Sequence, residues 1–139
     1  MKFAYADPPD SMCMEGDFVL RVPAGIGSKA DLLSAFAEKG RFPSYFGGNW
    51  DALLDCLRDL SWISNRRVMV VHGDLPLHNS SAECRIYLDI LQAAVADWSE
   101  SSKAPTAESS PEWVCIDHEL MIVFPSRAKK AVVNILAEE

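Results

Sequence analysis

The sequence has little positive charge for its size, with 13 lysine and arginine residues against 20 aspartate and glutamate residues and a formal net charge of -7 at pH 7. A surface of this sign repels phosphate backbones, so direct binding of nucleic acid is not expected. The same charge suits a protein that must find a basic partner, because complementary charge accelerates association. Solubility alone is the simpler explanation of the acidity.

Paired cysteines, metal ligands and long apolar runs are also lacking. Cys13, Cys56, Cys84 and Cys115 form no C-x-x-C pair, and no histidine stands at zinc-ligand spacing, so neither a metal nor another cofactor is expected. Their apolar neighbours predict buried free thiols in a reducing compartment. Residues 1–14 show no apolar segment of a secretory signal, and no run approaches the roughly 18 apolar residues of a membrane span. We therefore expect a cytoplasmic protein.

The chain has the length and composition of one folded domain. Its 139 residues are 49% hydrophobic and 24% charged, which is enough to bury a core without disulfides. Residues 1–16 are expected to form an irregular extension of this domain (residues 1–139), and residues 99–111, rich in Ser, Ala, Pro and Glu, a mobile loop. The sequence does not indicate an oligomeric state.

Strand and helix patterns alternate along the chain, which predicts an α/β fold with a small, mainly parallel three-stranded sheet packed with helices. The strands are expected at Phe18–Val22, Arg67–His72 and Leu120–Phe124, with a weaker candidate at Trp113–Ile116. The helices are expected from Ser28 to about Lys39, from Asn49 to about Leu60, from Ser80 or Ser81 to about Ser99, and from Ser126 to Leu136, the last being an extra C-terminal helix.

The helix predicted over residues 49–60 has two distinct faces. At about 100° per residue its apolar residues fall within an arc of about 120°, whereas Asp51, Asp55 and Asp59 fall on another face about 80° wide. Carboxylates four residues apart repel one another, so this stripe is locally unfavourable unless a cationic group lies opposite. Asp51 is the exception, because the helix dipole favours an acid in the first turn. The stripe is either a solvated helix face or a binding surface for a cationic partner.

The segment just before this helix adds aromatic and flexible residues. Tyr45 and Phe46 are followed by Gly47 and Gly48, and Asn49 can cap the helix. Exposed aromatic rings beside unpaired acids are typical of a protein-binding hot spot. The alternative is inward packing of both rings over the preceding helix.

The run from Phe42 to Leu60, FPSYFGGNWDALLDCLRDL, resembles the loop-plus-helix signature of the barstar family, intracellular inhibitors of secreted ribonucleases. The shared pattern is an aromatic pair, Gly, one variable residue, Asn, an apolar residue, Asp-Ala-Leu, another bulky residue and Asp-Cys-Leu. The predicted order of strands and helices is also that of the family. The resemblance therefore implies a barstar-like fold.

The resemblance also implies roles for residues, because in that family the loop and helix enter the nuclease cleft and the helix aspartates take the place of substrate phosphate. Asp55 matches the principal phosphate-mimicking acid and Asp51 its partner one turn earlier. Tyr45 matches an aromatic that packs on the catalytic face, and Gly47 a glycine that allows close backbone approach. A ribonuclease clusters cationic groups around the scissile phosphate, and a rigid carboxylate pair can bind the same donors, so inhibition of a basic ribonuclease by occupancy needs no catalysis. The candidate partner-binding residues are Tyr45, Phe46, Gly47, Gly48, Asn49, Asp51, Asp55 and Asp59.

The sequence departs from the family pattern at three positions. Ser44 and Gly48 stand where acids are expected, and Arg58 places a cation near the edge of the acidic stripe. These changes concern the identity of the partner more than the mode of binding. They keep open a related function, an immunity or antitoxin protein against a toxin that is not a ribonuclease, because a fold does not fix the partner.

A small α/β enzyme is the competing interpretation, with His72, Asp74, His78 and His118 as its candidate residues. His72 and Asp74 stand at the end of a buried strand, where ligands often bind in parallel sheets. However, the sequence has no Gly-rich phosphate loop, no nucleophile elbow and no histidine pairing of known spacing. It therefore favours turn and surface roles for these residues.

Overall fold

A parallel sheet with the strand order β1-β4-β3-β2 forms the centre of the fold. The computed structural model describes residues 3–43, 46–101 and 118–137. The strands are β1 (Phe3–Tyr5), β2 (Phe18–Val22), β3 (Arg67–His72) and β4 (Glu119–Phe124). The α-helices are α1 (Lys29–Lys39), α2 (Trp50–Asp59), α3 (Ser81–Ser101) and α4 (Lys129–Ala137), and the short 3-10 helices are η1 (Pro9–Met12) and η3 (Ser126–Ala128).

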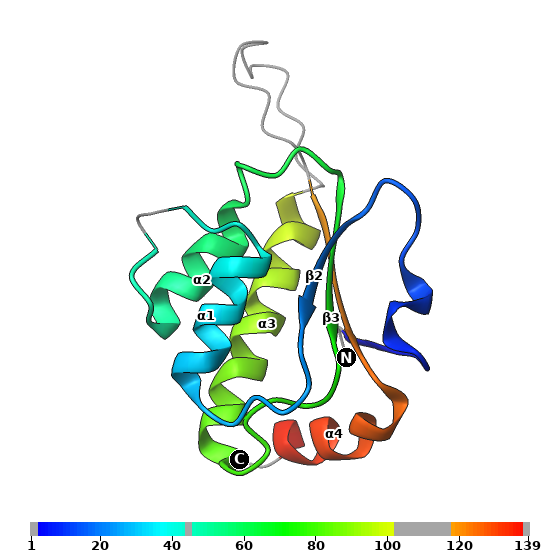
Figure 1. Cartoon of the computed structure of the whole chain (residues 1–139), viewed down its shortest axis with the longest axis vertical. Coiled ribbons are helices and arrows are strands. Elements are labelled where there is room, and N and C mark those ends of the chain that lie inside the picture. Colours follow the sequence, from blue (N-terminus) through cyan, green and yellow to red (C-terminus); the bar gives the residue numbers. More distant parts are fainter. Residues whose placement is uncertain (1–2, 44–45, 102–117, 138–139) are drawn as a thin grey trace.

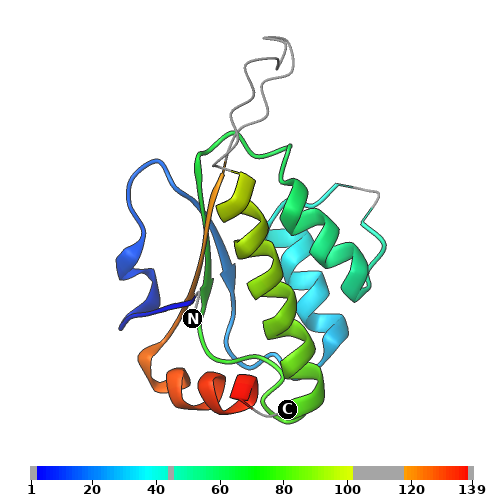
Figure 2. The ribbon, with the colours of Figure 1, turned by 180° about the vertical axis from the view of Figure 1, so that it is seen from behind.

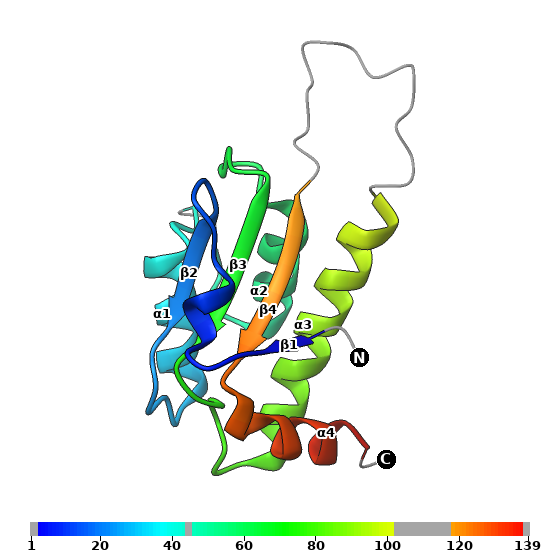
Figure 3. The same cartoon turned by 90° about the vertical axis from the view of Figure 1, so that its right-hand side faces the viewer.

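The helices and the N-terminal segment cover opposite faces of the sheet. Figure 1 shows α1, α2 and α3 on one side of the strands and the segment that carries η1 on the other. The reverse view in Figure 2 shows α4 across the end of the sheet at which β4 stops. Figure 3 shows η1 in front of the strands and β1 beside β4. The predicted α/β class with a parallel sheet is confirmed.

Burial on both faces makes β3 the centre of the core. Val68 and Val70 point towards the helices and join the larger hydrophobic cluster, whereas Met69 and Val71 point the other way and join a smaller cluster. Alternate residues of a strand project to opposite faces, so a strand covered on both sides is apolar throughout, as the RVMVVH run predicts. Helix α3 lies against this sheet next to β4 and carries α2 on its other side.

The sheet has four strands where the sequence predicted three. The additional strand, β1, lies in the stretch expected to be an irregular extension and pairs in register from Phe3 with Ile122 to Tyr5 with Phe124. Three residues are too few to show a strand period, so the pattern gave no signal for it. Two predictions lie wholly or partly outside the described residues, namely the strand at residues 113–116 and residues 102–111 of the mobile loop. The first residues of the predicted loop belong to α3, which continues to Ser101.

A buried histidine and tyrosine link β3 to β4 and α3. His72 has no exposed surface, and its Nδ1 lies 3.0 Å from the carbonyl oxygen of Val123, which can only accept, so Nδ1 carries the proton. Nε2 then accepts a hydrogen bond from the Tyr87 hydroxyl at 2.6 Å. Burial lowers the pKa of His72 from 6.5 to about 4, against a smaller opposing effect of the Val123 hydrogen bond. His72 is therefore neutral in the folded protein at physiological pH.

The pKa of His72 is lower in the folded protein than in the unfolded chain, and this difference predicts a loss of stability in mild acid. Between pH 6.5 and pH 4 the unfolded chain binds the His72 proton and the folded protein does not, so the stabilisation present above pH 6.5 is lost as the pH falls. The slope of the free energy of unfolding approaches about 1.4 kcal/mol per pH unit from this group alone. Urea unfolding followed from pH 7 to pH 5 measures the slope. An NMR titration of the His72 ring that gave a folded-state pKa near 6.5 would contradict the assignment.

Candidate protein-binding surface

Helix α2 begins with a well-formed cap. The Asn49 side chain accepts a hydrogen bond from the Ala52 backbone N–H at 2.8 Å, which satisfies one of the amides that has no partner within the helix. Gly48, just before the cap, has φ of 70°, a left-handed conformation that glycine adopts without strain. The loop therefore turns into the helix at a fixed point, and Asn49 acts there as a positioning residue.

The two faces predicted for α2 are present. Leu53 and Leu57 are fully buried in the larger hydrophobic cluster, whereas Asp51, Asp55 and Asp59 are exposed. We call these three residues the acidic face of α2. They lie on one side of a rigid helix whose other side is fixed in the core.

Cys56 lies within the same helix, buried between its two faces. Burial raises the pKa of its thiol, and the negative charges of Asp59 and Asp55 raise it further. The thiol therefore stays protonated and adds no charge to the acidic face. Cys56 and Cys84 are buried and free, as expected, whereas Cys13 is free but only half-buried, and Cys115 lies outside the described residues.

The C-terminal end of α2 is held by side chains from two other elements. Trp98 of α3 donates from Nε1 to the Leu57 carbonyl oxygen at 2.8 Å. His118, just before β4, donates from Nε2 to the carbonyl oxygen of Leu60 at 2.9 Å, and its ring meets the Trp98 ring edge-on. The last carbonyl groups of a helix lack partners within it, so these two bonds satisfy the end of α2 and fix it to the sheet layer.

The cation next to the acidic face is paired with α3. The Arg58 guanidinium forms an ion pair with the carboxylate of Asp97, and both side chains are about half exposed. Arg58 is thereby directed towards α3, while Asp51 and Asp55 stay open to solvent. The Asp59 carboxylate accepts a hydrogen bond from the Ser61 hydroxyl at 3.3 Å.

The loop before α2 is only partly described. Phe46 is half-buried and its ring packs edge-on against Phe42 at 5.0 Å between centroids, which is the inward orientation considered as an alternative. Gly47 and Gly48 are exposed. Ser44 and Tyr45 lie outside the described residues, so the role assigned to Tyr45 stays a prediction.

The residues of the competing enzyme interpretation have structural partners. Both ring nitrogens of His72 are hydrogen bonded inside the core, and Nε2 of His118 serves the end of α2. Asp74 accepts from the Leu75 backbone N–H and faces Arg127, whereas His78 is exposed. Within the described ranges, no cluster of three or more His, Cys, Asp or Glu side chains could hold a metal ion. In that same part of the chain no helix has the length and apolar character needed to cross a bilayer.

Sequence reasoning missed the residues that position α2. The turn and surface roles predicted for His72 and His118 are wrong, because both side chains are buried. No sequence pattern pointed to the contacts of Trp98 and His118 with α2. Asp97 was not predicted to have a role. The position of Arg58 beside three aspartates is a signal that an acid on a neighbouring element could form an ion pair with it. Such contacts join residues about 40 to 60 positions apart, which no local pattern reports.

Removal of the Trp98 donor should loosen the acidic helix. In Trp98→Phe the Leu57 carbonyl loses its partner, which should cost about 1–3 kcal/mol of the free energy of unfolding. Amide hydrogen exchange at the last turn of α2 should accelerate as well. The matched control is Trp62→Phe, which removes a similar bond, from Trp62 Nε1 to the Gly40 carbonyl oxygen at 3.0 Å, at the end of α1. If amide hydrogen exchange at the last turn of α2 were equally fast in both variants, Trp98 would have no specific role in holding that turn.

Comparison with known families identifies the same region. A family model described as Barstar (barnase inhibitor) matches residues 18–110, a span that begins at β2 and includes α1, α2, β3 and α3. No curated protein and no solved structure matches the chain. The matched span contains the acidic face of α2 and the loop before it.

Proposed function

This chain belongs to the barstar family, and from that premise we propose that it is a cytoplasmic inhibitor that blocks the active site of a basic ribonuclease with the acidic face of α2. The observation that carries the proposal is the exposure of Asp51, Asp55 and Asp59 on one side of a helix that Asn49 caps at its start and that Trp98 and His118 hold at its end. The inhibitor acts by occupancy and performs no catalysis.

Rigid carboxylates suit this task for an electrostatic reason. A ribonuclease holds arginine, lysine and histidine around the scissile phosphate, and charge-assisted hydrogen bonds to a carboxylate can replace those to a phosphate oxygen. A helix held at both ends pays little conformational entropy on binding, which strengthens each such bond in the complex. Asp55 is the principal acid in this proposal, and Asp51 is its partner one turn earlier.

The local repulsion on the acidic face supports the same function. Three aspartates at four-residue intervals disfavour one another in the free protein, and a cationic cleft relieves that repulsion in the complex. Arg58 does not fully offset the repulsion among these aspartates, because its guanidinium pairs with Asp97 on α3. In this proposal the contact surface is completed by the loop residues Tyr45, Phe46, Gly47 and Gly48. Phe46 contributes only the part of its ring that Phe42 leaves exposed.

The test is inhibition of a barnase-type ribonuclease by the full chain, with binding followed by calorimetry. Asp55→Ala should weaken binding by about 2–5 kcal/mol, a range for which the barnase–barstar pair of this family is itself a reference case. The matched control is Asp89→Ala, which removes the same charge from the part of α3 where Asp89 pairs with Arg85, at 3.2 Å. The control should change the affinity little. Equal effects of the two substitutions would contradict a specific role for Asp55.

A second candidate function is favoured by Gly48, which is exposed and offers no carboxylate where the family pattern has an acid. In this alternative the same face of α2 binds a basic toxin that is not a ribonuclease. The inhibition assay separates the two candidates. Full ribonuclease activity in the presence of excess inhibitor chain would argue against the first candidate and leave the second.

A further inference from the structure

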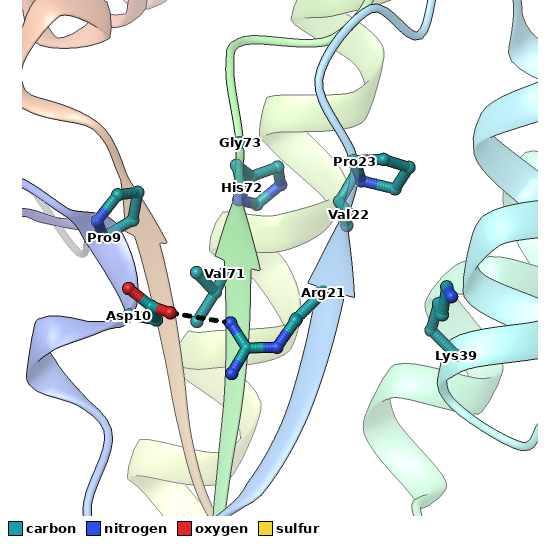
Figure 4. Close-up of a pocket in the computed structure, with 9 residues that line it drawn as sticks. All are labelled: Pro9, Asp10, Arg21, Val22, Pro23, Lys39, Val71, His72 and Gly73. Atoms are coloured by element: carbon teal, nitrogen blue, oxygen red, sulfur yellow. Dashed lines mark hydrogen bonds and ion pairs between the residues drawn. The ribbon is translucent and has the colours of Figure 1, made fainter.

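A cavity of about 430 Å³ lies where β2 and β3 end, away from the acidic face of α2. Figure 4 shows its lining residues, with Val71 between the segment that carries η1 and the end of β2. Pro9 and Pro23 contribute further apolar surface. The cavity has the size of small-molecule pockets, about 300–1,000 Å³, and parallel sheets often bind ligands at the carboxyl ends of their strands.

The charge of this cavity is opposite to that of the whole molecule. Arg21 and Lys39 line it together with one acid, Asp10, which gives the lining an excess of one positive charge in a chain with a net charge of -7. The side chain of His72, which also belongs to the lining, is fully buried and hydrogen bonded to Val123 and Tyr87, so it adds no charge to the cavity. Glu38, the neighbour of Lys39, is not part of the lining. The two cations therefore give the cavity a local attraction for a small anion within an acidic chain.

The Arg21 guanidinium is available to a ligand because its present partner is exchangeable. Arg21 pairs with Asp10 at 3.0 Å, and Figure 4 shows its side chain extended along the sheet towards that carboxylate. The two side chains are 57% and 43% exposed, and ion pairs this open to solvent contribute little to stability. The ammonium group of Lys39 is similarly exposed and lies 3.8 Å from Glu38, so it is held no more firmly. Both cations can turn towards an anion at small cost.

We propose that this cavity binds a small amphipathic anion, with its apolar body against Val71 and the two prolines and its acidic group paired with Arg21. Lys39 stands beyond β2 (Figure 4) and supplies a second positive contact from the opposite rim. The lining comes from the η1 segment, the ends of β2 and β3, and Lys39 at the end of α1 (Figure 4). No residue of α2 lines the cavity, so the proposal does not depend on the ribonuclease function.

The experiment uses 8-anilinonaphthalene-1-sulfonate, an aromatic monoanion whose fluorescence rises in apolar surroundings, titrated into the full-length protein at neutral pH. Saturable binding is expected. Arg21→Ala/Lys39→Ala should weaken it at least about tenfold, because two charge-assisted contacts are removed. Asp10→Asn should instead tighten it by about threefold or more, because a neutral amide no longer competes for Arg21. A damaged fold would not produce that increase in affinity, and circular dichroism checks the fold of each variant.

The matched control is Arg66→Ala/Lys130→Ala, which removes one arginine and one lysine that do not line this cavity. Arg66 lines a different cavity, beside Trp98 and His118, so the control also tests whether the probe binds there. The control should change the affinity for the probe by less than about twofold, which allows for the small general effect of removing two positive charges. Absence of saturable binding, equal losses in the two double variants, or weaker binding by Asp10→Asn would overturn the proposal.

Discussion

The orientation of the acidic face of α2 depends on two hydrogen bonds at the end of that helix. Trp98 and His118 donate to the Leu57 and Leu60 carbonyl oxygens, and through them the last turn of α2 is tied to α3 and to the start of β4. Asn49 caps the other end. With Leu53 and Leu57 in the core, the helix has little freedom to rotate or fray, and the orientation of the acidic face follows from the packing of the whole domain.

Because the helix is held in this way, it can carry charges that oppose its own formation. Aspartates one turn apart disfavour a free helix by a few tenths of a kcal/mol per pair, which buried leucines and satisfied ends easily outweigh. The pair of Arg58 with Asp97 removes the nearest cation from the centre of the face. What remains is a pre-formed cluster of negative charge on the exposed side of α2.

Local patterns predicted much of this fold. The apolar run of β3, the Asn49 cap and the limits of α1 near Ser28 and Lys39 are properties of short segments, and the structure confirms each. β1 was missed because three residues show no period, and it exists only through its pairing with β4. The division of α2 into two faces was predicted for the same local reason. The contacts of Arg58, Trp98 and His118 were not, because they depend on how α2, α3 and β4 meet in space.

In the complex that we propose, the acidic face of α2 takes the place of substrate phosphate. The most direct measurement is the affinity of the chain for a barnase-type ribonuclease at increasing concentrations of a nucleoside monophosphate that occupies the nuclease active site. We expect competition, with the apparent dissociation constant rising in proportion to nucleotide concentration once the active site is saturated. An affinity that stays constant while the nucleotide fills the active site would contradict it.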